Sequence, residues 1–130
     1  MAESVPAQLL HAAQIHRSAC KALDAAPGIA DTVIGFHAQQ VCEKCFKAAL
    51  VGGGIEAPRS HDLTRLMELL IGNGMAVPAA ARWVDELTPY AVAARYGMVA
   101  LGLLDRPRAL LTVDLLCQWA SSLLPPPASP

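Results

Sequence analysis

The chain has 130 residues, of which 54% are hydrophobic and only 16% are charged. This length suits one domain, and the apolar content excludes a disordered chain. Ten Lys and Arg against eleven Asp and Glu give a net charge of −1, which excludes binding of nucleic acid or membrane by bulk electrostatics but leaves room for a local basic cleft.

The low charged fraction indicates that part of the outer surface is covered as well, most simply by a second copy of the chain. No apolar run approaches the ~20 residues of a membrane span, and the first residues lack the basic and apolar regions of a signal peptide. We therefore predict a cytoplasmic protein without a membrane segment. The cysteines are too few and scattered for a disulfide scaffold, so we interpret them as reduced core thiols: Cys20, Cys42, Cys45 and Cys117.

Prolines and glycines divide the chain into segments whose apolar residues recur at helical spacing. The first two helices are predicted over about residues 6–26 and 30–51. The second carries Gly35 in its interior, where a glycine can permit a close helix crossing. Ser60 is the predicted N-cap of a third helix, which ends at Gly72-Asn73-Gly74.

The rest of the chain is predicted to be helical too, with a short helix over about 79–87, a further turn from Tyr90 toward Tyr96, and a last helix over about 107–124. The apolar and polar alternation of half-buried strands is nearly absent. We predict an all-α fold over residues 1–124, an antiparallel four-helix up-and-down bundle with a short extra helix. The Pro-rich residues 125–130 are expected to form a disordered tail.

Two polar clusters interrupt the apolar pattern. Arg59, Ser60 and His61 place a cation, a hydroxyl and an imidazole at a helix N-terminus, where backbone N–H groups favour anions. Arg95 and Tyr96 combine a guanidinium that can hold phosphate with a ring that can stack on a base. Each cluster also has a purely structural interpretation: a capped helix whose imidazole packs on a neighbour, and an arginine that binds carbonyls or a carboxylate.

Metal and cofactor motifs are not recognisable. Cys42 and Cys45 form a single C-x-x-C pair, whereas a zinc site usually needs two such pairs or matching histidines. The three glycines at 52–54 follow a helix and lack the Lys-Ser/Thr of a phosphate loop. We therefore assign no metal ligand, no cofactor and no catalytic residue.

Three segments occur in the order known from one family. The segment from Phe36 to Leu50 resembles a QQ-A-EK-x-x-KA helix, residues 58–63 resemble a P-R-T-H-D-L signature, and Tyr90-x-x-x-x-Arg95-Tyr96 resembles a Y-x-x-x-x-R-Y-P element, with Gly97 in place of the proline. All three resemble motifs of HEPN domains (higher eukaryotes and prokaryotes nucleotide-binding). The resemblance extends over about residues 9–124.

The resemblance implies an all-α bundle that commonly dimerises around a cleft and often works beside a minimal nucleotidyltransferase, sometimes as a toxin–antitoxin pair. Many members of the family are metal-independent ribonucleases with an arginine and a histidine in an R-x4-6-H motif. This chain departs from that pattern because no histidine follows His61. Residues 100–102, where Arg95 would need a histidine, are Ala, Leu and Gly.

The leading hypothesis is a HEPN-like homodimer that binds a nucleotide or RNA, lacks the ribonuclease motif and pairs with a small nucleotidyltransferase. Arg95 is expected to bind phosphate and Tyr96 to stack on a base or offer its hydroxyl, with further nucleotide-binding groups at Lys44, Lys47, His61 and Arg59. Two alternatives stay open. One is a ribonuclease that uses His61 with Arg95, which requires the two side chains to converge, and the other is a dimeric assembly module without a small ligand.

Overall fold

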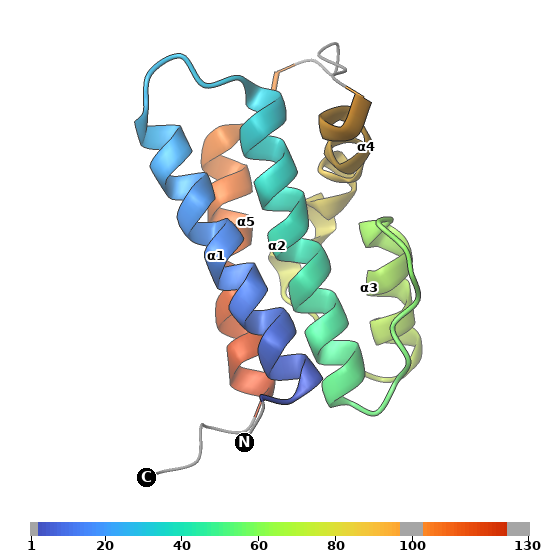
Figure 1. The fold of residues 1–130 in the computed structure, drawn as a ribbon. Coiled ribbons are helices and arrows are strands. Elements are labelled where there is room, and N and C mark those ends of the chain that lie inside the picture. Colours follow the sequence, from blue (N-terminus) through green and yellow to red (C-terminus); the bar gives the residue numbers. More distant parts are fainter. Residues whose placement is uncertain (1–2, 97–102, 125–130) are drawn as a thin grey trace, which may run out of the picture.

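The computed structural model describes residues 3–96 and 103–124, and of Ala94, Arg95 and Tyr96 only the backbone. Within these residues every regular element is helical, which confirms the all-α prediction (Figure 1). The predicted tail lies outside the described residues. The elements are α1 (Val5–Ala25), α2 (Asp31–Gly52), α3 (Leu63–Gly72), the 3-10 helix η1 (Ala79–Glu86), α4 (Thr88–Tyr96) and α5 (Arg106–Leu123).

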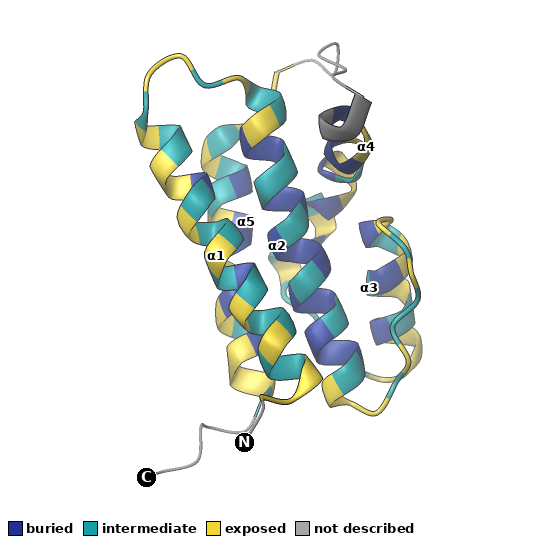
Figure 2. Ribbon diagram, viewed as in Figure 1, coloured by how far each residue is buried: buried dark blue, intermediate teal, exposed yellow. Residues whose placement is uncertain are grey.

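Helix α2 is the central element of the bundle, because α1, α3, α4 and α5 all pack against it. From Val41 to Leu50 every residue is buried except Lys44 and Lys47, and Figure 2 shows this helix as the most deeply covered one in the view. A helix that is covered on nearly all sides must satisfy its polar side chains inside the protein. The charged residues of this stretch, Glu43, Lys44 and Lys47, must therefore find partners within the protein or reach its surface.

Helix α3 departs from the predicted up-and-down alternation, since it runs in the same direction as the second half of α2. Gln39 Nε2 donates to the backbone oxygen of His61 just before α3, and the end of α2 at Gly53 lies beside Met75, which follows α3. The glycines that end α2 are followed by a non-helical connection, residues 53–62. Ten residues of extended chain span about 33 Å, more than the length of α3, so the chain can return before the helix begins.

Helices α3 and α4 meet at their starts and line one side of α2 together (Figure 1). Thr88 Oγ1 accepts a hydrogen bond of 3.2 Å from the backbone N–H of Leu63. From there α4 extends toward the first turns of α2, where the Tyr90 ring lies against Gly35. A Cβ atom at Gly35 would stand 2.3 Å from Tyr90 Cδ1, so the interior glycine does permit a close approach, as predicted.

The cap of α3 corrects one detail of the sequence-based prediction. The N-cap of α3 is Asp62 rather than Ser60, because Asp62 Oδ1 accepts from the backbone N–H of Arg65, while Ser60 Oγ accepts from the N–H of Asp62. A carboxylate suits the positive end of the helix dipole better than a hydroxyl does. The short helix predicted after Pro78 is present as a 3-10 helix, a form common in brief connecting segments.

Ion pairs fix α5 against the first two helices. Arg106 Nε donates to Asp31 Oδ1 at 2.7 Å and its Nη2 donates to the carbonyl of Ile29, so the start of α5 is held at the α1–α2 connection. Farther along, Arg17 Nε of α1 donates to Asp114 Oδ1 at 2.6 Å. Among the described helices none is both long and apolar enough to cross a bilayer.

Candidate functional site

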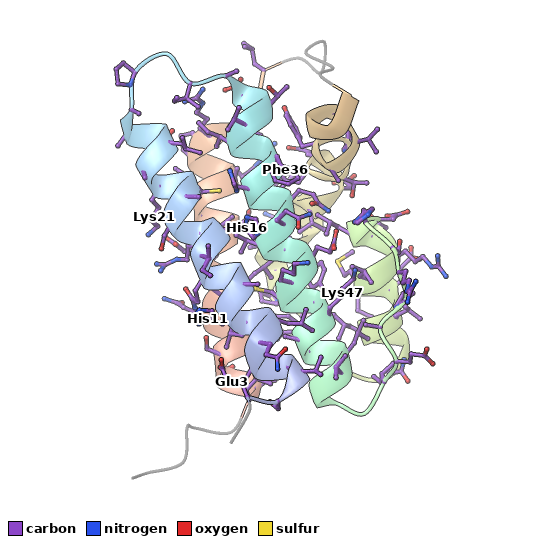
Figure 3. The ribbon with its side chains drawn as sticks, viewed as in Figure 1. Glu3, His11, His16, Lys21, Phe36 and Lys47 are labelled. Atoms are coloured by element: carbon purple, nitrogen blue, oxygen red, sulfur yellow. The ribbon has the colours of Figure 1, made fainter. Side chains whose placement is uncertain are left out.

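A buried carboxylate organises the polar groups between α2 and the start of α3. Glu43 is 1% exposed, and three side chains donate to it. Gln39 Nε2 and His61 Nδ1 reach Oε1 at 3.0 and 2.8 Å, and Lys47 Nζ reaches Oε2 at 3.1 Å. We call these four residues the Glu43 cluster, and Figure 3 shows Lys47 where α2 faces α3.

Helical spacing explains why three of the four residues meet. Gln39, Glu43 and Lys47 are four residues apart and so share the face of α2 that α3 covers. His61 comes from the connection before α3, and its backbone oxygen accepts from Gln39 Nε2 at 3.1 Å. Gln40 Nε2 donates to Gln39 Oε1 at 2.7 Å, which fixes the orientation of the Gln39 amide.

The Glu43 carboxyl group is ionised at neutral pH. Burial acts to raise its pKa, but the hydrogen bonds from Gln39, His61 and Lys47 together outweigh burial and leave the pKa below its usual range. Lys47 supplies the compensating charge, and its side chain is only 15% exposed. The ion pair between Lys47 and Glu43 is therefore mostly shielded from solvent.

The carboxylate also determines how the His61 ring is held. An ionised carboxylate only accepts hydrogen bonds, so His61 Nδ1 carries the proton and Nε2 is the acceptor atom of the neutral ring. The His61 side chain is 44% exposed, in contrast to the buried Glu43. An imidazole oriented in this way can take up a proton, or donate to a phosphate oxygen when it is protonated.

The structure places the other predicted binding residues differently. Arg59 is exposed on the connection two residues before His61. Lys44 is not part of the Glu43 cluster. Its charge helps to lower the pKa of His16 on α1. Arg95 and Tyr96 are the last residues of α4, and their side chains lie outside the described residues. The convergence of Arg95 with His61, which the sequence left open and the ribonuclease alternative requires, depends on a side chain outside the described residues.

The backbone nevertheless shows how far Arg95 lies from the start of α4. This helix starts at Thr88, which contacts the first residue of α3, and Arg95 follows seven residues later. Seven residues of α-helix rise about 10 Å.

Sequence reasoning missed Gln39 and Glu43 as members of the site. The signal was present, because both lie in the motif from Phe36 to Leu50 and are spaced four residues apart with Lys47. A carboxylate that shares one helix face with a glutamine and a lysine, in a helix rich in apolar residues, is a candidate buried acceptor that needs donors.

A second polar contact, between α1 and α2, was also missed. His16 Nδ1 and His37 Nδ1 lie 2.9 Å apart, and the edge of Phe36 packs against both rings. We call these two residues the histidine pair. Burial lowers the pKa of both imidazoles. For His16 the charges of His37 and Lys44 lower it further, against an opposing effect of Glu43.

Comparison with known families identifies the chain. A family model described as HEPN domain matches residues 28–123, which takes in α2 to α5 and with them the whole Glu43 cluster. The protein therefore belongs to the HEPN domain family, and the resemblance inferred from its three motifs is confirmed. Searches among curated proteins and among solved structures returned no match.

Proposed function

We propose that this HEPN domain binds a nucleotide or an RNA segment where α2 meets the start of α3. The observation that carries the proposal is that one buried carboxylate holds His61 and Lys47 side by side, in a chain that belongs to the HEPN family. The exposed Arg59 lies two residues from His61 and adds a cation near the same end of α3. Phosphate groups are the natural ligands of such clustered donors.

In and around the Glu43 cluster, the polar side chains fall into two sets: a shielded ion pair, and two side chains that solvent reaches. Glu43 and Lys47 neutralise one another inside the protein. His61 and Arg59 are the groups exposed enough to reach a ligand. Arg95 would bind the phosphate with its two-pronged guanidinium, and Tyr96 would stack on the base. A site with so few cations suits a nucleotide or a short strand rather than a long duplex.

We also infer that the protein works as a homodimer and pairs with a small nucleotidyltransferase, as in a toxin–antitoxin pair. Large apolar side chains on its surface support an interface. Leu111 and Leu115, one turn apart on α5, are 58% and 36% exposed, and Ile15 on α1 is 59% exposed. Light scattering on the eluted protein tests the dimer, and a monomer at micromolar concentration would contradict it.

A binding titration tests the main proposal. Fluorescence anisotropy with a labelled short RNA, and calorimetry with ATP, would compare the wild type with Arg95→Ala and Arg59→Ala. Loss of a phosphate contact should weaken binding about tenfold for Arg95→Ala and less for Arg59→Ala. Arg82→Ala is the matched control, because Arg82 is an exposed arginine stacked on Trp83 in η1. Unchanged affinity in Arg95→Ala, or no binding by the wild type, would remove the proposal.

The contact of 2.8 Å between His61 Nδ1 and Glu43 Oε1 favours one second candidate, a ribonuclease. A carboxylate-oriented imidazole can remove the proton of a ribose 2′-hydroxyl, whose oxygen then attacks the phosphorus. The bond from phosphorus to the 5′-oxygen of the next nucleotide breaks, and that oxygen takes a proton from water, while the imidazolium returns its own proton to solvent. The products would be a 2′,3′-cyclic phosphate and a 5′-hydroxyl. Cleavage by the wild type and by His16→Gln, but not by His61→Gln, would support this activity. RNA left intact by the wild type would exclude it.

A further inference from the structure

The core holds two thiols from different helices in direct contact. Cys45 of α2 donates its S–H to Cys117 of α5, with the sulfur atoms 3.9 Å apart. Cys45 is 0% exposed and Cys117 is 3% exposed, so Cys117 is the one cysteine of the four with any measurable surface. A small reagent that enters from solvent therefore meets Cys117 first.

The surroundings of Cys117 favour its thiolate. The hydrogen bond from Cys45 is the main cause of a pKa below the usual range for Cys117, and the charges of Arg17 and Lys21 act in the same direction against burial and Asp114. Both cations are held in place by Asp114, at 2.6 and 3.1 Å from its Oδ1. The same contact raises the pKa of Cys45, which keeps its proton.

The other two cysteines lack these features. Cys20 donates to the carbonyl oxygen of Ile34 at 3.6 Å, and burial raises the pKa of its thiol to about 12. Cys42 lies one turn from Cys45 on α2, and burial raises its pKa as well. Both thiols are 0% exposed. They are therefore matched internal controls for the contacting pair.

We propose that Cys45 and Cys117 form an oxidation site, at which a hydroperoxide converts the two thiols into a disulfide that joins α2 to α5. Cys117 is the attacking thiol and Cys45 the resolving thiol. A disulfide bond is about 2.05 Å long, so the sulfur atoms must approach by about 2 Å from their distance of 3.9 Å. The two thiols are already in hydrogen-bond contact in the reduced fold, so this pairing needs only a small movement of the side chains.

The reaction needs one equivalent of hydroperoxide and proceeds in two steps. The Cys117 thiolate attacks one peroxide oxygen, the O–O bond breaks, and the products are a sulfenic acid on Cys117 and hydroxide, or an alkoxide from an organic peroxide. Cys45 then attacks the Cys117 sulfur, the S–O bond breaks, and the leaving hydroxide takes the Cys45 proton. The two thiols lose two electrons and two protons, and hydrogen peroxide is reduced to two water molecules.

Mass spectrometry of the full chain tests the site. The reduced, folded protein is treated with one to a few equivalents of hydrogen peroxide, and its intact mass and non-reducing peptide map are recorded. We expect a loss of about 2 Da, from two hydrogens, with Cys45 and Cys117 in one linked peptide pair. Closing so long a loop should raise the melting temperature by several degrees, and a thiol reductant should reverse the rise.

Variants separate the roles of the two cysteines. Cys42→Ala and Cys20→Ala should form the same disulfide as the wild type. Cys45→Ser should stop at a sulfenic acid on Cys117, which dimedone traps, and Cys117→Ser should keep its original mass. If a substitution prevents folding, the wild-type peptide map decides alone. A disulfide between other cysteines, or none in the folded protein, would overturn the proposal.

Discussion

Two polar contacts flank α2, and each joins an imidazole of another segment to a side chain of this helix. On the α3 side His61 meets Glu43 at 2.8 Å, and on the α1 side His16 meets His37 at 2.9 Å. The distances are almost equal, but the partners differ in charge. The carboxylate only accepts hydrogen bonds, whereas the two imidazoles of the histidine pair compete for one proton.

Contacts of similar length in one bundle therefore differ in their response to acid. The Glu43 cluster contains its own compensating charge in Lys47 and persists while Glu43 is ionised. The histidine pair is next to Lys44, whose charge also disfavours protonation of His16. We therefore assign the ligand-binding role to the compensated cluster and a packing role to the histidine pair.

Removal of the Glu43 carboxylate should cause the largest loss in the free energy of unfolding. Glu43→Ala leaves Lys47, Gln39 and His61 without their common acceptor, and should cost about 2–4 kcal/mol in the free energy of unfolding. Chemical denaturation measures the loss. Glu68→Ala, at an exposed carboxylate on α3, should change stability by less than about 0.5 kcal/mol. Equal stabilities of the two variants would show that Glu43 does not organise the cluster.

Substitution of either lysine of α2 should reduce the free energy of unfolding by less than Glu43→Ala does, and the loss should be greater for Lys47 than for Lys44. Lys47→Met removes the charge that compensates a buried carboxylate and should cost about 1–2 kcal/mol. Lys44→Met, three residues earlier on α2, should stay within about 0.5 kcal/mol of the wild type at neutral pH, because Lys44 makes no ion pair with any of the described residues. Urea denaturation of both variants gives the comparison, and a greater loss for Lys44→Met would contradict the assigned roles.

The pH dependence of stability should be the smallest effect. The pKa values of His16 and His37 are lowered in the folded state, so the unfolded chain binds more protons as the pH falls below about 6.5. The stability contributed by the pair is complete above that pH and decreases as acid is added. Between pH 7 and 5 Glu43 stays ionised, since its pKa is lowered, and its contribution holds.

Thermal unfolding between pH 7 and 5 measures this decrease. The variant His16→Gln should show a flatter profile, and Lys44→Met should raise the pKa of His16, which proton NMR can follow. His11→Gln is the matched control, because His11 is an exposed histidine on the same helix. A stability that rises on acidification over this range would contradict the neutral state of the pair.

Much of the fold could be predicted from the sequence because prolines and glycines mark the helix ends. The direction of α3 could not, since helical spacing does not indicate how the connection 53–62 returns along the bundle. The residue types in the site were partly predictable. His61 and Lys47 were expected as binding groups, but Glu43, which brings them together, was not among the expected site residues. The histidine pair depends on the pairing of α1 with α2, which the sequence pattern does not fix.

The affinity of His61→Gln for a short labelled RNA, measured beside that of His16→Gln, decides whether the Glu43 cluster is the binding site. Each variant loses one imidazole that contacts a side chain of α2. Both affinities are measured at the same salt concentration, and circular dichroism verifies that the variants are folded. We expect His61→Gln to bind several-fold more weakly and His16→Gln to bind as the wild type does. Wild-type affinity in His61→Gln, or an equal loss in both variants, would contradict the assignment of the site to the Glu43 cluster.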